Sequence, residues 1–523
     1  MSKRDGLRIA GAVLTGLMLA VSFPGWGQST VVFTALVPLL LAVQSVSSKR
    51  AAGLAWLSGM VFFGLSLSWF WKMTHTVDVW LFKVGTLGGF LILIGYCALY
   101  FIPFALAACW CGRLWGKGSL LQNLRVMLLL TGVWCGSEFL RGILFSGFGW
   151  NALGISQYAN PATIQLAERG GVLAVSAVIV WMNAGVFLTV RQYVQGGQLR
   201  KYRPHFELML GLVPLALSVM FGMRVLFSPL PMGEPLQVGL IQPNIPQTAR
   251  RDAAMNREIR ERLESLSSAA LRIDEIALLV WPETAAPDYV RLSFPSRALV
   301  NRLTREGVPL LVGSMDYGDV DGERRLYNSS LLFEGGKEPV ASYHKRHLVP
   351  FGEYVPLPGL LRFLSPLDVD FSAGDSATVF EMEGAAPFGV LICFEDTMGW
   401  LARDVVRGGA RWLVNQTNDA WFDPSAQSEQ HLAHAVFRCV ENRVPMVRSC
   451  NTGVTAIIDA YGRVERRLEP RQGGFLVGAV RPALAERVPT VYTVSGERFA
   501  QVVLAGGVLS FLLLGVALRR HAR

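Results

Sequence analysis

The sequence predicts two structural parts, a multi-pass α-helical membrane bundle with eight crossings and one α/β domain. Of the 523 residues, 51% are hydrophobic and only 17% are charged, and the mean hydropathy is +0.36. That composition is too apolar for a soluble protein of this length. The first half alternates apolar runs with short polar joints, whereas residues 229–498 alternate short β-branched runs with helical patterns. The second pattern is typical of an α/β domain of roughly 250 residues.

The apolar runs are each long enough to cross about 30 Å of hydrocarbon. We place the crossings at residues 7–23, 31–46, 51–71, 85–111, 126–140, 172–190, 208–226 and 501–518. Glu138 and Arg141 interrupt the end of the fifth crossing, where such residues are either functional or a structural ion pair. No small-residue cleavage pattern precedes Phe23, so we expect the first crossing to be an uncleaved anchor.

Basic residues mark every other polar joint, with Lys72 and Lys83 as the exceptions. Because cytoplasmic joints carry an excess of Lys and Arg, both termini are predicted to be cytoplasmic and the α/β domain to lie on the far side. The predicted parts are residues 1–228 with seven crossings, residues 229–498 as the α/β domain, and residues 499–523 with the eighth crossing and a cytoplasmic tail. The same placement of the basic residues explains the net charge of +10 without a nucleic-acid partner.

Three reactive side chains stand at the ends of predicted strands. Cys393 ends the apolar run that begins at Phe388, Glu283 follows the run of residues 276–281, and Lys345 follows a short run that ends in Tyr343 and His344. Active sites of α/β enzymes lie at such strand ends, and a carboxylate, an ammonium and a thiol could form a base-activated nucleophile. Taken singly, each has a structural explanation: a core thiol, a carboxylate at a helix start, and a solvated basic loop.

The contexts of these residues resemble the signatures of the nitrilase, or carbon–nitrogen hydrolase, superfamily. The three motifs occur in order within residues 236–480: Trp281-Pro-Glu283, Tyr343-His-Lys-Arg-His-Leu-Val-Pro-Phe-Gly-Glu-Tyr-Val-Pro356 and Gly389-Val-Leu-Ile-Cys-Phe-Glu395. The resemblance implies an αββα sandwich in which Glu283 is the general base, Cys393 the nucleophile and Lys345 the stabiliser of the tetrahedral intermediate.

The resemblance also implies supporting residues around the three. Glu353 corresponds to the family's second glutamate, which positions the others by hydrogen bonds. The backbone N–H of Phe394 joins Lys345 in the oxyanion hole, and Glu395 completes the motif. Removal of one oxyanion donor typically costs about 3 kcal/mol of transition-state stabilisation.

The membrane half narrows the resemblance to the bacterial apolipoprotein N-acyltransferases. The matching segments are Ser22-Phe-Pro-Gly-Trp26, Ser137-Glu-Phe-Leu-Arg141, Gly147-Phe-Gly-Trp-Asn151, Gln242-Pro-Asn-Ile-Pro-Gln247 and Asn415-Gln-Thr-Asn-Asp-Ala-Trp-Phe422. This resemblance implies that a phospholipid, usually phosphatidylethanolamine, acylates Cys393 through its sn-1 chain. The thioester then passes the acyl group to the α-amine of a diacylglyceryl-cysteine on an apolipoprotein. It further implies a monomer in the bacterial inner membrane, with a periplasmic catalytic domain and without a cofactor.

One position departs from the family's sequence pattern, and several other residues have two alternative roles. Where the family usually carries a Lys-Trp pair, this chain has Arg250-Arg251. If the family's Trp shapes the lipid entrance, this chain must line its entrance differently, and we do not assign that role to Arg251. Trp421 and Phe422 either line the acyl pocket or are core aromatics. A separate pair, His431 and His434, lies three residues apart on a predicted helix, but no third metal ligand is apparent. The remaining cysteines, Cys439 and Cys450 among them, are expected to be free core thiols.

Two other functions compete with acyl transfer. A membrane-tethered amidase would keep the fold and use water as the acceptor for the acyl group. A transporter with a regulatory soluble domain would leave the Glu-Lys-Cys set unexplained, and the crossings contain few ionisable or broken midpoints of the kind that mark substrate paths.

Overall fold

The computed structural model describes residues 2–75, 80–112, 119–196, 206–250, 252–273, 275–320, 322–336, 338–356, 358–362 and 370–522. The chain divides into two compact units, each built from separate stretches of sequence. Unit 1 contains Met1–Ser68, Gly89–Pro229 and Val494–Arg523. Unit 2 contains Trp69–Gly88 and Leu230–Thr493. Trp69–Gly88 therefore belongs with unit 2, although the predicted division assigned it to the membrane domain.

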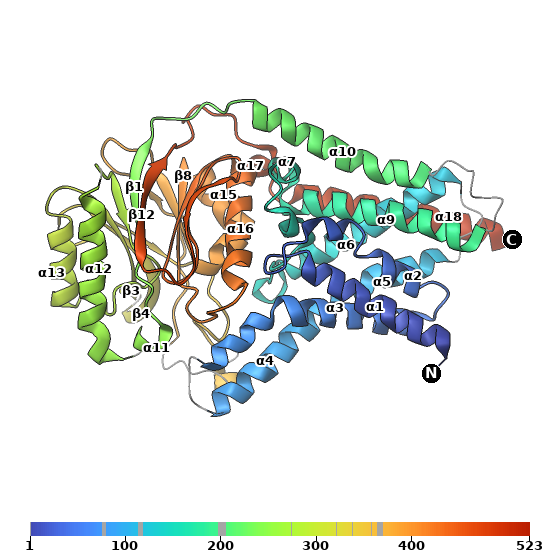
Figure 1. Ribbon diagram of the computed structural model, residues 1–523, viewed down its shortest axis with the longest axis horizontal. Coiled ribbons are helices and arrows are strands. Elements are labelled where there is room, and N and C mark those ends of the chain that lie inside the picture. Colours follow the sequence, from blue (N-terminus) through green and yellow to red (C-terminus); the bar gives the residue numbers. More distant parts are fainter. Residues whose placement is uncertain are drawn as a thin grey trace. The chain divides into compact units, whose positions relative to one another are not determined.

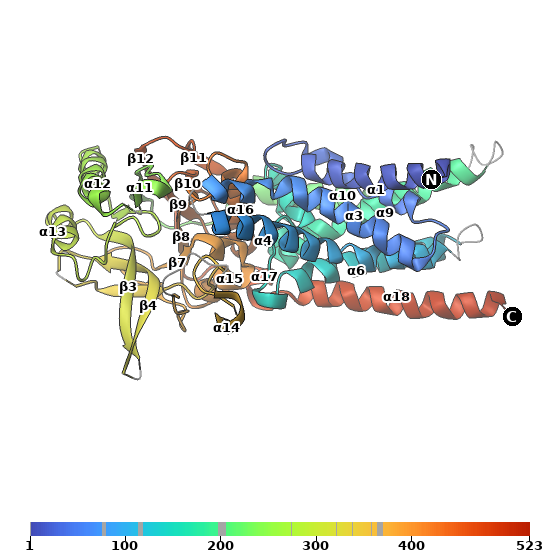
Figure 2. The same ribbon diagram turned by 90° about the horizontal axis from the view of Figure 1, so that it is seen from below.

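Unit 1 is helical (Figure 2). Its longer helices are α1 (Lys3–Val21), α3 (Ser48–Ser66), α5 (Ile102–Cys111), α6 (Leu120–Arg141), α9 (Val172–Gly196), α10 (Phe206–Phe227) and α18 (Arg498–Ala522). Its short helices are α2 (Val37–Ala42), α7 (Pro161–Ile164) and α8 (Ala167–Gly170). Helix α4 (Trp80–Leu99) begins in unit 2 and ends in unit 1.

Four helical segments among the described residues are long and apolar enough to cross a membrane: Lys83–Cys111, Val172–Tyr193, Phe206–Phe227 and Arg498–Val516. The bent pair Ser48–Ser66 and Ser68–His75 would make a fifth. The second predicted crossing is not one helix, because residues 31–46 divide into a 3₁₀ turn (Ser29–Phe33) and the six-residue α2. Six residues rise only about 9 Å, less than a third of the hydrocarbon thickness. Apolar helices are thus confirmed, whereas the count of eight crossings is not.

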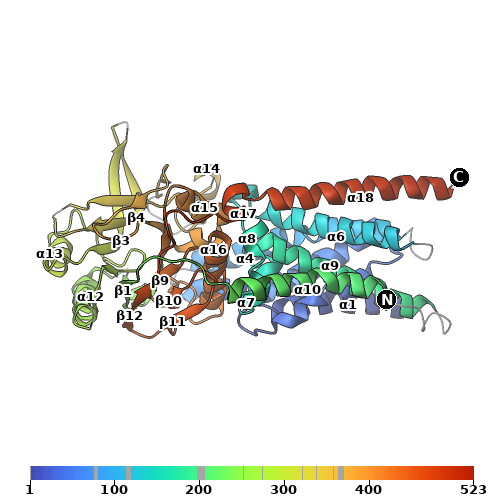
Figure 3. The same ribbon diagram turned by 90° about the horizontal axis from the view of Figure 1, so that it is seen from above.

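Small residues allow the helices of unit 1 to approach one another closely. A Cβ atom on Gly132 of α6 would lie 2.7 Å from the carbonyl oxygen of Val503 and 2.8 Å from Cα of Gly507, both on α18. The two helices run side by side (Figure 3). Gly185 of α9 and Gly211 of α10 make a similar contact. Such small-residue contacts are characteristic of helix packing in membranes, where lipid removes the hydrophobic drive for association.

Unit 2 contains two six-stranded sheets. In the first, the strand order is β12-β1-β2-β3-β4-β5, and in the second it is β11-β10-β9-β8-β7-β6. Parallel pairing joins β1, β2 and β3 in one sheet and β7, β8 and β9 in the other, whereas the outer strands pair antiparallel. The strands are β1 (Leu236–Gln242), β2 (Leu278–Val280), β3 (Leu310–Val320), β4 (Glu323–Phe333), β5 (Ala341–His344), β6 (Val379–Phe380), β7 (Phe388–Ile392), β8 (Trp412–Thr417), β9 (Met446–Cys450), β10 (Thr455–Ile458), β11 (Val464–Leu468) and β12 (Gly474–Val480).

The two sheets pack face to face between helices (Figure 1). Side chains such as Leu240 and Val280 of the first sheet share one buried cluster with Val390 and Val414 of the second. Helices α12 (Asn256–Leu271) and α13 (Phe294–Leu303) cover the outer face of the first sheet. Helices α15 (Gly399–Arg407) and α16 (Gln427–Asn442) lie on the side of the second. The expected αββα arrangement is confirmed. The remaining helices are α11 (Gln247–Arg250), α14 (Pro358–Leu361) and α17 (Val491–Ser495).

Candidate active site

Three strands of unit 2 end beside the predicted reactive residues. β2 leads to Glu283, β5 ends directly before Lys345, and β7 ends directly before Cys393. β2 and β5 belong to one sheet and β7 to the other. Because the two sheets face each other, residues that are far apart in the sequence meet at the same end of the sandwich.

Lys345 lies between two buried carboxylates. Its Nζ is 2.9 Å from an oxygen of Glu353 and 3.6 Å from Oε1 of Glu283. Asn328 of β4 donates from Nδ2 to Oε1 of both glutamates, at 2.8 Å each. The backbone N–H of Val349 donates to the other oxygen of Glu353 at 2.8 Å. Each carboxylate is therefore held by more than one donor, which fixes the ammonium group in place.

Cys393 occupies a sharp turn at the tip of β7. Its φ angle is 52°, in the left-handed region that non-glycine residues rarely adopt. The turn continues into a short 3₁₀ helix, Cys393–Thr397, and the Cys393 residue remains partly exposed. Its thiol is close enough to the Glu283 carboxylate for each group to shift the pKa of the other. The base and the nucleophile of the predicted set are thus adjacent.

Burial and the neighbouring charges together set the protonation of the three groups. It raises the pKa of Glu283 above the ordinary value, although the ammonium of Lys345 opposes this shift. Burial together with the negative charge of Glu283 raises the pKa of Cys393 well above its usual range. Burial alone would lower the pKa of Lys345, but the carboxylates of Glu353 and Glu283 raise it. At neutral pH the site therefore holds a cation and a neutral thiol, together with a carboxylate that accepts a proton more readily than an exposed glutamate.

Glu395 joins the segment that carries Lys345 to the turn that carries Cys393. Its Oε1 accepts hydrogen bonds from the backbone N–H groups of Arg346, at 2.8 Å, and His347, at 3.1 Å. Its Oε2 accepts from the N–H of Ile392 at 2.8 Å, and the Tyr343 hydroxyl contacts both oxygens. One fully buried side chain thus connects the two sheets beside the site.

A network of buried charges lies behind the Cys393 turn. His431 of α16 stands between Asp396, at 2.8 Å, and Asp419, at 3.0 Å. Arg448 of β9 contacts Asp396 at 2.6 Å and Asp419 at 3.6 Å. No group of His, Cys, Asp or Glu suited to a metal ion occurs among the described residues. His431 therefore belongs to this network, and the sequence pattern gave no sign of its partners Asp396 and Arg448.

The residues expected near the lipid entrance are only partly described. Phe422 packs edge-to-face on Trp69, with ring centroids 4.7 Å apart, and Trp69 Nε1 donates to Gln430 at 3.0 Å. Trp421 is partly buried. Arg250 Nη2 donates to Thr284, the residue after the predicted base, at 2.9 Å. Its neighbour, residue 251, lies outside the described residues.

Cys439 and Cys450 are fully buried free thiols.

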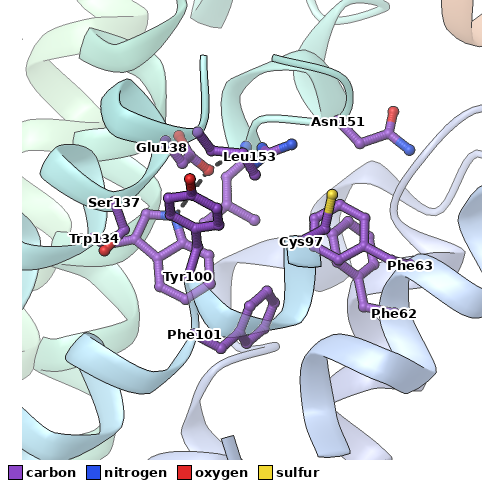
Figure 4. Close-up of a pocket in the computed structure, with 11 residues that line it drawn as sticks. Phe62, Phe63, Cys97, Tyr100, Phe101, Trp134, Ser137, Glu138, Asn151 and Leu153 are labelled. Carbon is purple, nitrogen blue, oxygen red and sulfur yellow. Dashed lines mark hydrogen bonds between the residues drawn. The ribbon is translucent and has the colours of Figure 1, made fainter. Parts of the chain in front are cut away.

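Glu138 and Arg141 of unit 1 bind backbone groups of the loop that follows α6. Glu138 Oε1 accepts from the N–H of Leu153 and from Trp134 Nε1, both at 2.8 Å. Arg141 Nη1 donates to the carbonyl oxygens of Phe148 and Trp150, at 2.8 and 2.6 Å. Both residues line a cavity of about 20 Å³. Figure 4 shows Glu138 in this lining, beside Trp134 and Leu153. The Glu138 and Arg141 side chains attach this loop to the helix bundle through hydrogen bonds to the loop backbone. From the sequence we expected either a functional role or an ion pair between the two side chains.

A strand-end thiol beside a buried Glu–Lys–Glu set in an αββα sandwich is typical of the carbon–nitrogen hydrolases. The family model described as "Carbon-nitrogen hydrolase" matches residues 237–490. The family model described as "Apolipoprotein N-acyltransferase N-terminal domain" matches residues 15–185.

Relatives of nearly the same length place the chain within this class. It is 35% identical to an apolipoprotein N-acyltransferase of Geobacter metallireducens, covering 98% of this chain and 95% of the relative. It is 30% identical to one of Rhodopseudomonas palustris, covering 96% and 94%. An amidase of the nitrilase superfamily from Nesterenkonia has 17% identity and a TM-score of 0.37, covering 52% of this chain and 98% of the amidase. On the evidence of the two sequence relatives, the chain belongs to the apolipoprotein N-acyltransferase family.

Proposed function

We propose that this protein acylates the N-terminal amine of diacylglyceryl-cysteine on apolipoproteins, the last step of lipoprotein maturation, through a thioester on Cys393. The observation that carries the proposal is the contact set of one buried site: the Cys393 thiol beside Glu283, and Glu283 beside Lys345. Family membership supports the same reaction, because the relatives are named apolipoprotein N-acyltransferase.

The first half-reaction forms the thioester. Glu283 takes the proton of the Cys393 thiol while the sulfur attacks the sn-1 ester carbonyl of a phospholipid such as phosphatidylethanolamine. The ammonium of Lys345 and the backbone N–H of Phe394 stabilise the resulting oxyanion. The intermediate then collapses, Glu283 returns the proton to the departing alkoxide, and a lysophospholipid leaves. The raised pKa of Glu283 suits a group that must accept and return a proton.

The second half-reaction transfers the acyl group. The α-amine of diacylglyceryl-cysteine attacks the thioester carbonyl, and Glu283 accepts a proton from the nitrogen. The C–S bond breaks, an amide forms, and the Cys393 thiol is restored. Asn328 donates to Glu283, and Glu353 accepts from Lys345 and from Asn328. These two residues therefore keep the base and the ammonium in position during both steps.

The membrane arrangement follows from the substrates, which are both anchored in lipid. We infer a monomer in the bacterial inner membrane with both termini in the cytoplasm and unit 2 in the periplasm. Helices α1 and α6, of 19 and 22 residues, are long enough to supply crossings beyond the four most apolar segments. The distribution of Lys and Arg in the polar joints supports this orientation.

Intact-mass analysis tests the proposal directly. The purified protein is incubated with phosphatidylethanolamine, and a Cys393→Ala variant is treated in parallel. We expect a hydroxylamine-labile gain of one acyl chain that is absent in the variant, followed by its loss when a diacylglyceryl peptide is added. A folded protein that gains no acyl chain but hydrolyses small amides would instead be a membrane-tethered amidase.

A further inference from the structure

The peptide bond between Cys393 and Phe394 is held on its carbonyl side by two side chains. Nε2 of His431 lies 3.3 Å from the carbonyl oxygen of Cys393, and Nδ2 of Asn415 lies 3.5 Å from the same oxygen. This peptide is trans, and the C=O and N–H groups of a trans peptide point in opposite directions. Any group that fixes the carbonyl of Cys393 therefore also fixes the direction of the Phe394 N–H.

The imidazole of His431 has contacts at both nitrogens. Nε2 lies 2.8 Å from Asp396 Oδ1, and Nδ1 lies 3.0 Å from Asp419 Oδ1. Burial alone would lower the pKa of His431, but the carboxylates of Asp396 and Asp419 raise it to about 9. Both nitrogens are therefore protonated at neutral pH, and both donate hydrogen bonds.

Arg448 closes the network around this peptide. Its Nη1 donates to Asp396 at 2.6 Å and to the side-chain oxygen of Asn415 at 2.5 Å. Both groups that contact the Cys393 carbonyl, His431 and Asn415, are thus connected through Asp396 and Arg448. All four side chains are buried, so they have little freedom to move.

The backbone at Cys393 needs such support. A left-handed conformation is unfavourable for a non-glycine residue, because the Cβ atom comes close to the following carbonyl oxygen. At a φ of 52° the Cys393 peptide would rotate toward a more favourable geometry if its carbonyl were released. That rotation would turn the Phe394 N–H away from its present direction.

We propose that His431 is a positioning residue for acyl transfer, which holds the Cys393–Phe394 peptide so that the Phe394 N–H points at the developing oxyanion. The inference rests on the proposed function, in which this N–H assists Lys345. In this role His431 exchanges no proton with the substrate. Its effect reaches the reaction only through the orientation of one backbone donor.

The test compares His431→Gln with His434→Gln, a matched control. His434 is a buried histidine on the same helix, three residues further on. Acylation of Cys393 is measured with phosphatidylethanolamine and with a soluble p-nitrophenyl ester. Alkylation of Cys393 by iodoacetamide, followed by peptide mass, reports the reactivity of the thiol itself. Alkylation forms no oxyanion, so it does not depend on the direction of the Phe394 N–H.

We expect His431→Gln to lower kcat for acylation at least about tenfold and to leave KM within about twofold, since only the transition state uses the donor. Its alkylation rate is expected to stay within about threefold of the wild type, and His434→Gln to keep near-wild-type rates in every assay. Asp396→Asn removes the charge that holds His431 and is the second variant. Because both residues act on one peptide, the double variant is expected to lose about as much activity as the more impaired of the two single variants.

Three results would overturn the proposal: wild-type acylation by a folded His431→Gln protein, equal losses in acylation and alkylation, or additive losses in the double variant. A failure of the proposed function would give a different result from a failure of the role proposed for His431. In that case the wild type would be acylated by the p-nitrophenyl ester and not by phospholipid, and the ester rates would still decide the role of His431.

Discussion

Replacement of Glu395 by glutamine tests how the two sheets are held together at the site. The carboxylate accepts backbone hydrogen bonds from Arg346, His347 and Ile392 as well as from the Tyr343 hydroxyl. In Glu395→Gln one acceptor oxygen becomes an NH₂ group. Whichever orientation the amide takes, at least one buried N–H loses its acceptor and faces another donor.

The magnitude follows from two opposing terms. A buried donor without an acceptor costs about 1–3 kcal/mol, and the surviving bonds lose the strength of a charged acceptor. Burial raises the pKa of Glu395, which shows that the hydrogen bonds do not fully offset the lost hydration of the charge. Glutamine recovers part of that cost. We therefore expect a net loss of about 1–3 kcal/mol of unfolding free energy, or a fall in Tm of a few degrees.

Scanning fluorimetry in detergent measures the Tm, and mass analysis of a diacylglyceryl peptide measures acyl transfer. We expect Glu395→Gln to lower transfer more than about tenfold, because Lys345 and Cys393 lose their shared anchor. Tyr343→Phe is the control, since it keeps the carboxylate and removes only one hydroxyl. A Glu395→Gln protein with wild-type Tm and wild-type transfer would refute the reasoning.

Three further predictions concern protonation and packing. The acylation rate should rise with pH through the pKa of Glu283, and its acidic limb should lie above that of an ordinary glutamate, since burial raises this pKa; an acidic limb at or below the position expected for an exposed glutamate would contradict a role for Glu283 as base. Lys345→Met should abolish acylation and lower the Tm, because Glu283 and Glu353 lose the cation between them; the Tm deficit should shrink as pH falls through the raised pKa of Glu283, whose charge is then neutralised. Gly132→Ala should lower the Tm, since its Cβ would meet backbone atoms of α18, whereas Gly53→Ala, with open space around it, should not; equal Tm values for the two variants would show that the close approach is unimportant.

The reactive residues could be predicted because each follows a short strand. Glu283, Lys345 and Cys393 stand in distinctive motifs, and strand ends meet at one edge of a sandwich. Asn328 lies in the middle of β4, and Arg448 lies within β9, the strand after α16, so neither stands at the end of a strand. Their importance comes from pairing between strands and between sheets, which a single sequence does not specify.

In unit 1, helix boundaries and loop contacts could not be predicted from the sequence. Four of the predicted crossings coincide with helices that are long and apolar enough to span a membrane. Composition does not distinguish one long helix from a turn followed by a short helix, as in residues 29–42. Similarly, the spacing of Glu138 and Arg141 suggested a pair on one helix face. Their actual partners are backbone groups of the following loop, and loop conformations have no periodic signature.

The contact between α6 and α18 has a consequence for the order in which the chain is made. Roughly 350 residues separate the two helices in the sequence, so at typical translation speeds α6 waits on the order of half a minute for its partner. During that time the glycine-lined face of α6 at Gly132 is free to contact lipid or other helices in the membrane. The last helix of the chain therefore completes the first unit to be inserted, and ribosomes that stop before α18 would release a bundle with this face uncovered.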